Sequence, residues 1–299
     1  MASSAKAKVR CAHSQTFSFS FTSSRHTQSG SNTPSATSHQ HEVYLQQSHS
    51  QGSQHGTATH EDDMLPFFPR FESQWLCDEK LLVAWFEPHF AQAKYNLDPG
   101  NNGGSNACTL IAVLLSSYCS SEKVLTTCTH NQISYCIIKA LGIAMLNGNE
   151  IYNRLKREGQ LPNVNLSIPE AISCAGKFAS RIKEWKSVLY MQSLSDSLFT
   201  NTQGHLDEWN ASAHAQRHNY LYIILISDAR SVLFINNRKD NSITLVDSHQ
   251  HSAYKGAAIA VVNKANFRCL CNWFVHILQK YNQSNPGLYE LSFLYYRRK

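Results

Sequence analysis

The segment that most constrains the fold is an apolar run that begins directly after a glycine-rich loop. Residues 96–107 (NLDPGNNGGSNA) are rich in glycine and asparagine and contain a proline, a composition that favours turns. Residues 109–119 (TLIAVLLSSYC) are apolar almost all round at helical spacing. A helix of this kind needs burial on every side. We therefore expect it at the centre of a domain, with other elements packed around it.

The remaining patterns place helices first and antiparallel strands second. Helical spacing is found at 81–87 and 132–156. The Ser167–Glu170 capping box opens a further helix, whose inward-facing residues are Ile172, Ala175, Phe178, Ile182 and Trp185. After Asn219, apolar runs between turn residues predict strands at 220–226, 231–235, 242–246, 257–262 and 288–296, with a helix at 266–281. This order predicts the α+β class, with a helical N-terminal part packed on an antiparallel sheet.

Composition divides the 299-residue chain into two unequal parts. Residues 1–62 are rich in Ser, Gln, His and Thr and poor in Leu, Ile and Val. Such a stretch buries too little apolar surface to offset the entropy of ordering the chain. We therefore expect a disordered tail over residues 1–62 and one folded domain over residues 63–299.

Charge and cysteine usage limit the partners and the compartment. The net charge of +6 comes without a concentrated Lys/Arg run, so no nucleic-acid partner is predicted. The N-terminus lacks the apolar core of a secretory signal, and no apolar run reaches the roughly 20 residues that span a bilayer. The nine scattered cysteines indicate thiols in a reducing compartment. We expect a cytoplasmic or nuclear protein with no membrane partner. Arg10 and Arg25 in the acid-poor start leave an organellar transit segment as an alternative.

Cys108 alone among the cysteines stands where a glycine-rich loop meets a helix. The unpaired N–H groups and the positive end of the helix dipole stabilise a thiolate there and lower its pKa. The same N–H groups can donate to an oxyanion that forms on an attacked carbonyl. The alternative is a buried structural cysteine after an ordinary glycine turn.

A candidate base lies at the end of the expected strand 242–246, in the segment DSHQH that begins at Asp247. Side chains at positions i and i+2 share one face of a strand, so Asp247 and His249 point the same way, about 7 Å apart along the chain. A carboxylate there can orient an imidazole and stabilise its charged form. His251 shares this face if the strand continues, and it is the alternative candidate for the base. Two alternatives remain: a turn that leaves both histidines solvated, and a metal site formed by the three side chains.

The two segments together resemble a known family. The first is the run GSNACT that ends at Thr109 and is followed by a buried helix, and the second is the distant run VDSH that ends at His249. This pattern resembles the deubiquitinating cysteine protease domain of herpesvirus large tegument proteins and related cellular domains. The resemblance covers about residues 101–260. It implies a papain-like cysteine protease fold, with Cys108 as the nucleophile, His249 as the general base and Asp247 as its orienting acid. It also implies ubiquitin or a ubiquitin-like modifier as the partner, and no cofactor.

The family pattern is incomplete in one respect, because its oxyanion-hole Gln is not found just upstream of Cys108. Asn102, six residues before Cys108, is the expected replacement, with Asn101 and Asn106 as competing candidates. An Asn side chain is one methylene shorter than Gln, which changes the geometry of the hole. We expect a cysteine-dependent hydrolase of the deubiquitinase-like isopeptidase kind. The alternative is an inactive papain-like domain that binds ubiquitin or acts as a scaffold.

Overall fold

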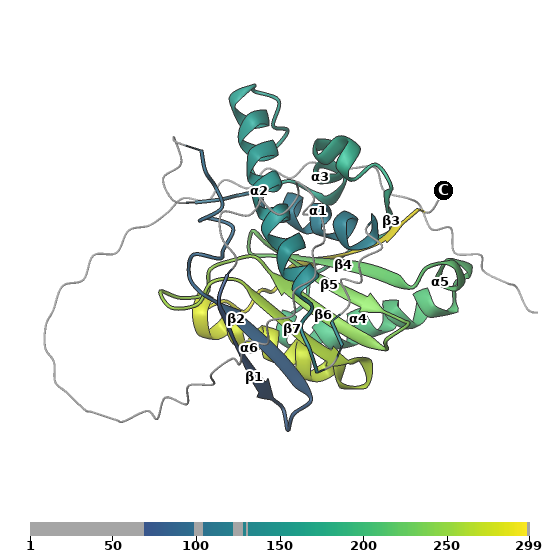
Figure 1. The fold of residues 1–299 in the computed structure, drawn as a ribbon. Coiled ribbons are helices and arrows are strands. Elements are labelled where there is room, and N and C mark those ends of the chain that lie inside the picture. The colour runs from purple at the N-terminus through teal and green to yellow at the C-terminus, as the bar shows by residue number, and fades with distance from the viewer. Residues whose placement is uncertain (1–68, 99–103, 122–127, 130, 298–299) are drawn as a thin grey trace, which may run out of the picture. The chain divides into compact units, whose positions relative to one another are not determined.

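An antiparallel sheet with helices on both faces forms the centre of the fold (Figure 1). The computed structural model describes residues 69–98, 104–121, 128–129 and 131–297. Within these residues the sheet has eight strands in the order β1-β2-β7-β6-β5-β4-β8-β3, and every neighbouring pair is antiparallel. The expected tail at residues 1–62 lies outside the described residues, as do Asn101 and Asn102.

The strands and helices of the described residues have the following bounds. The strands are β1 (Phe71–Leu76), β2 (Leu81–Phe86), β3 (Ile182–Tyr190), β4 (Tyr220–Ser227), β5 (Arg230–Asn237), β6 (Ser242–Asp247), β7 (Ala258–Asn263) and β8 (Tyr289–Tyr296). The helices are α1 (Cys108–Ser121), α2 (Tyr135–Arg157), α3 (Ile168–Ala175), α4 (Leu194–Ala211), α5 (Ala213–Arg217) and α6 (Phe267–Asn282), with short 3-10 turns at Gly176–Phe178 and Lys264–Asn266.

Two apolar cores lie on opposite faces of the sheet. Helices α1, α2 and α3 cover one face, where α1 contacts β4 and β5, while α4 and α6 lie on the other (Figure 1). Along β4 the side chains alternate between the cores: Tyr222 and Ile224 face the α1 side, whereas Leu221 and Ile223 face the α6 side. A central sheet covered on both faces requires strands that are apolar on both sides.

The prediction of a central buried helix is confirmed. Helix α1 begins at Cys108, and Leu110, Ile111 and Val113 are at most 1% exposed. The α+β class is also confirmed, because helices pack on an antiparallel sheet. None of the helices within the described ranges is long and apolar enough to cross a membrane.

Two of the expected helices are wrong. In place of the helix expected at 81–87, Leu81–Phe86 form strand β2, whose six residues are all buried because they contribute to both cores in turn. A short run buried on both faces has no alternation to separate it from a helix. The helix after the capping box at Ser167 ends at Ala175, and Ile182 and Trp185 belong to the edge strand β3. Helix α4 was not foreseen, and strands precede as well as follow the helices.

Helices α1 and α2 approach closely at Gly148, which yields a prediction on stability. A Cβ atom at Gly148 would lie 2.6 Å from Cγ1 of Ile111, a buried side chain in the first turn of α1. Gly148→Ala should therefore lower the free energy of unfolding by about 1–3 kcal/mol, the usual cost of overpacking. Chemical denaturation measures this change.

Gly204 provides the matched control, because it lies in the exposed part of α4 with nothing within 4 Å of its added Cβ. Gly204→Ala should be neutral or stabilising by up to about 1 kcal/mol through helix propensity. Equal effects of the two substitutions would contradict the packing of α1 against α2.

Candidate active site

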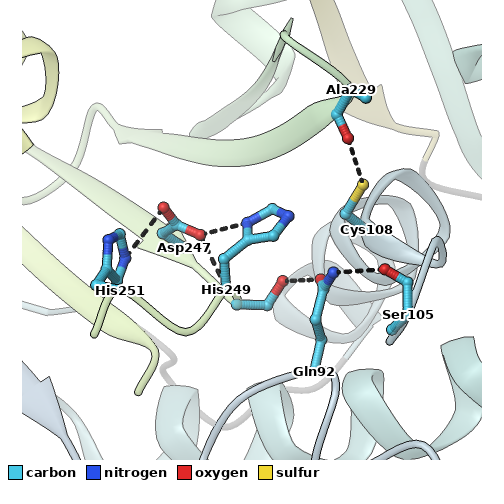
Figure 2. Close-up of polar contacts among 8 residues, drawn as sticks. Gln92, Ser105, Cys108, Ala229, Asp247, His249 and His251 are labelled. Atoms are coloured by element: carbon cyan, nitrogen blue, oxygen red, sulfur yellow. Dashed lines mark hydrogen bonds and ion pairs between the residues drawn. The ribbon is translucent and has the colours of Figure 1, made fainter. Parts of the chain in front are cut away.

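Cys108 is the first residue of α1 and lies beside the turn that joins β4 to β5. Just before the helix, the Ser105 hydroxyl accepts a hydrogen bond from the Ala107 N–H at 3.2 Å. Cys108 Sγ is 3.8 Å from the carbonyl oxygen of Ala229 in the turn (Figure 2). Because the first N–H groups of a helix have no intrahelical acceptor, the thiol stands next to unpaired backbone donors. The junction thus has the chemistry of an activated thiol.

Asp247 and His249 meet through a turn and not through an extended strand. Strand β6 ends at Asp247, and Oδ1 of Asp247 accepts hydrogen bonds from the His249 backbone N–H at 2.9 Å and from His249 Nδ1 at 2.7 Å. The carboxylate is fully buried, and His249 is 8% exposed. The His249 ring lies between Asp247 and Cys108 in Figure 2. The turn brings the two side chains closer than the expected strand face would.

Opposing effects set the pKa values of the thiol and the imidazole. Burial alone would raise the pKa of the Cys108 thiol, but the hydrogen bond and positive charge of His249, with hydrogen bonds from Ser231, lower it. Burial alone would lower the pKa of His249, but the charge and hydrogen bond of Asp247, aided by Cys108, raise it to about 9. A thiolate and an imidazolium therefore coexist in a pH range below about 9.

His251 lies on the other side of Asp247. Its Nε2 is 3.3 Å from Oδ2 of Asp247, and its side chain is fully buried. Burial alone would raise the pKa of Asp247, but the charges of His251 and His249 and the hydrogen bond of His249 hold it well below its usual range. The expected shared face of Asp247, His249 and His251 is thus replaced by one carboxylate between two imidazoles.

Gln92 connects the segment of Cys108 with the segment of His249, a role that no feature of the sequence indicates. Its backbone N–H donates to the carbonyl of Ser248 at 2.8 Å, and its Oε1 accepts from the Ser248 hydroxyl at 2.7 Å. Its Nε2 donates to the carbonyl of Ser105 at 3.2 Å (Figure 2). Asn149 Nδ2 in turn donates to the Gln92 carbonyl at 2.8 Å. A buried amide so connected fixes both halves of the site.

The other candidates have mixed outcomes. Asn102 and Asn101 lie outside the described residues, so the oxyanion role of Asn102 stays a prediction. Asn106 is exposed and hydrogen-bonds the hydroxyl of Tyr152. Within the described part of the chain, no group of three or more His, Cys, Asp or Glu side chains is arranged to hold a metal ion.

Comparison with known proteins gives matches in structure alone. No protein-family model and no curated protein sequence matches the chain. Its structure is similar to that of the ubiquitin-specific protease encoded by murine cytomegalovirus tegument protein M48, which was crystallised with a ubiquitin-based suicide substrate. The two share 11% sequence identity over 71% of this chain and 86% of that chain, with a TM-score of 0.44.

A second similar structure is the Pseudomonas avirulence protein AvrPphB, at 8% identity over 64% of this chain and 92% of that chain, with a TM-score of 0.36. Neither similarity names a substrate or an activity for this chain.

The pKa directions predict selective alkylation of Cys108. Limiting iodoacetamide at pH values from about 6 to 9 should label Cys108 first, because its thiolate persists to lower pH than an ordinary thiolate. Cys77 is the internal control, because its side chain is exposed to the reagent but the pKa of its thiol is raised by desolvation and by the neighbouring Cys269. Peptide mass mapping should show the preference for Cys108 growing as the pH falls. Labelling of Cys77 ahead of Cys108 near neutral pH would contradict the geometry.

Proposed function

We propose that this protein is a cysteine hydrolase that cleaves the amide or isopeptide bond after the C-terminal glycine of ubiquitin or a ubiquitin-like modifier. One observation supports the reaction type most strongly: a thiol of lowered pKa at a helix start, next to an imidazole that a buried carboxylate orients. This is the combination that nucleophilic acyl transfer by cysteine requires.

The reaction assigns one role to each side chain. The Cys108 thiolate attacks the carbonyl carbon, and the tetrahedral intermediate collapses as the C–N bond breaks and the leaving amine takes a proton from His249. His249 then accepts a proton from water as the water attacks the thioester, and cleavage of the C–S bond releases the product acid, which loses its proton to solvent, and restores the thiolate–imidazolium pair. Asp247 keeps the imidazole in the tautomer and orientation that both steps need.

The oxyanion is assigned to N–H donors at the start of α1 and to one side-chain amide. Backbone N–H groups of the first helical turn have no intrahelical acceptors and can donate to an oxyanion at the carbonyl bound by Cys108. Gln92 is the side-chain donor we favour, because its buried Nε2 donates one hydrogen to Ser105 and retains a second. Asn102 remains the competing donor from the loop.

The substrate assignment rests on the resemblance of the two motifs. The described part of the loop adds one supporting observation: the space around Gly104, four residues before the nucleophile, is open, with nothing within 4 Å of an added Cβ. An extended and narrow chain such as one ending in Gly-Gly can approach backbone of this kind closely. We therefore place the modifier's C-terminal tail along the loop that precedes Cys108.

A ubiquitin with an electrophile at its C-terminus tests the proposal. The wild-type protein should gain the mass of one ubiquitin, whereas Cys108→Ser and His249→Ala should not be trapped. His249→Ala should also return the pKa of the Cys108 thiol toward about 8.5. Probes built on other ubiquitin-like modifiers then rank the substrates. If iodoacetamide labels Cys108 but none of these probes does, the enzyme acts on another amide or ester. If the thiol is inert to both, the non-catalytic binding module becomes the better hypothesis.

Substitutions at Gln92 and Asn102 identify the oxyanion donor. Gln92→Glu keeps the side-chain length and the acceptor for the Ser248 hydroxyl but removes the amide donor. It should slow turnover by roughly 10²–10³-fold, the usual loss for one such donor, with little change in KM. Asn102→Ala should then be near wild type. The reverse pattern, with only Asn102→Ala impaired, would assign the role to Asn102 as the loop spacing predicts.

A further inference from the structure

We infer that His251 is a positioning residue that holds the carboxylate of Asp247 from the side opposite His249, so that the site is a chain of four groups, Cys108–His249–Asp247–His251. The inference rests on the proposed function for its catalytic consequence. Its structural basis is the place of one buried carboxylate between two buried imidazoles (Figure 2).

The two oxygens of Asp247 have different partners. Oδ1 accepts both the backbone N–H and the Nδ1–H of His249. Oδ2 lies 3.3 Å from His251 Nε2, which is ion-pair distance, but the two atoms are not aligned as a hydrogen bond. Oδ2 has no hydrogen-bond partner among the described residues. Neither ring nitrogen of His251 has a hydrogen-bond partner there either. Oδ2 and His251 are therefore the groups that can satisfy each other.

Aromatic side chains from two elements fix the ring of His251 in this place. The His251 ring makes T-shaped contacts with two aromatic rings. Its centroid lies 5.1 Å from that of Trp85 in β2 and 5.9 Å from that of Tyr281 in α6. Its backbone N–H donates to the carbonyl of Lys255 at 2.9 Å, which closes the loop beneath it. The titratable groups around His251 are thus Asp247 from β6, Tyr281 from α6, and Lys255, whose ammonium lies 4.4 Å from the Trp85 ring centroid.

The charge of the active site explains why a second donor is useful. The thiolate, the imidazolium and the carboxylate together leave one net negative charge in a buried site. A buried carboxylate needs donors on its oxygens to remain ionised and in place. An N–H from His251 on Oδ2 keeps Oδ1 directed at His249 Nδ1. If that donor is lost, the carboxylate can turn away, His249 loses part of its stabilisation as an imidazolium, and the Cys108 thiolate is stabilised less.

Two substitutions separate donation from packing. His251→Gln places an amide N–H near the position of the imidazole Nε2–H but lacks the ring. His251→Phe keeps an aromatic ring between Trp85 and Tyr281 but lacks the donor. Each variant is first shown to melt cooperatively, and His251→Leu replaces the Phe variant if Phe does not fold. The pH dependence of Cys108 alkylation by iodoacetamide is then measured, together with kcat and KM for a ubiquitin with a fluorogenic amide at its C-terminus.

In the Phe variant, the pH below which Cys108 alkylation slows should rise by about one unit. The kcat should fall about tenfold, with KM nearly unchanged. The Gln variant should stay near the wild type. The inference is overturned if Phe is near the wild type, or if Gln is impaired as much as Phe or more, because His251 would then serve packing alone. Alkylation requires no turnover, so a shifted profile without cleavage of any ubiquitin substrate would reject the proposed function and keep the positioning role.

Discussion

The structure around the active site depends on one buried carboxylate. Asp247 is fully excluded from solvent, and an ionised carboxylate in such a place is stable only when donors surround it. The donors come from the turn after β6, which returns the His249 N–H and imidazole to Oδ1, while His251 lies at ion-pair distance on the other side. The carboxylate in turn raises the pKa of His249, and His249 lowers the pKa of Cys108. The lowered pKa of the Cys108 thiol thus depends on the charge of the Asp247 carboxylate, acting through His249.

The same charges link the site to stability over a defined pH range. The raised pKa of His249 adds stability that is complete below its unfolded value of about 6.5 and is lost as the pH rises through about 9. The lowered pKa of Asp247 adds stability that is complete above about 3.9 and is lost as the pH falls through its folded value. Both contributions are complete between pH values of about 4 and 6.5.

The sequence pattern predicted α1 and α6 from helical spacing, and the strands after residue 219 from short apolar runs between turn residues. It failed for β2, because residues buried on both faces show no alternation. Asp247 and His249 were selected correctly as neighbours, but the expected reason, a shared strand face, is wrong, since hydrogen bonds in a turn join them. Gln92 could not be found, because its function arises only when Ser105 and Ser248 come together in the folded chain. Asn102 stays a prediction.

The central claim is that Cys108 and His249 form a thiolate–imidazolium pair supported by Asp247, and a paired titration tests it most directly. The imidazole of His249 is followed by NMR, and the thiolate of Cys108 by ultraviolet absorbance relative to Cys108→Ser. The account predicts that His249 remains an imidazolium until the pH reaches about 9, while the thiolate is already present at lower pH. A His249 that titrates near 6.5, with a thiol that ionises only near 8.5, would contradict it.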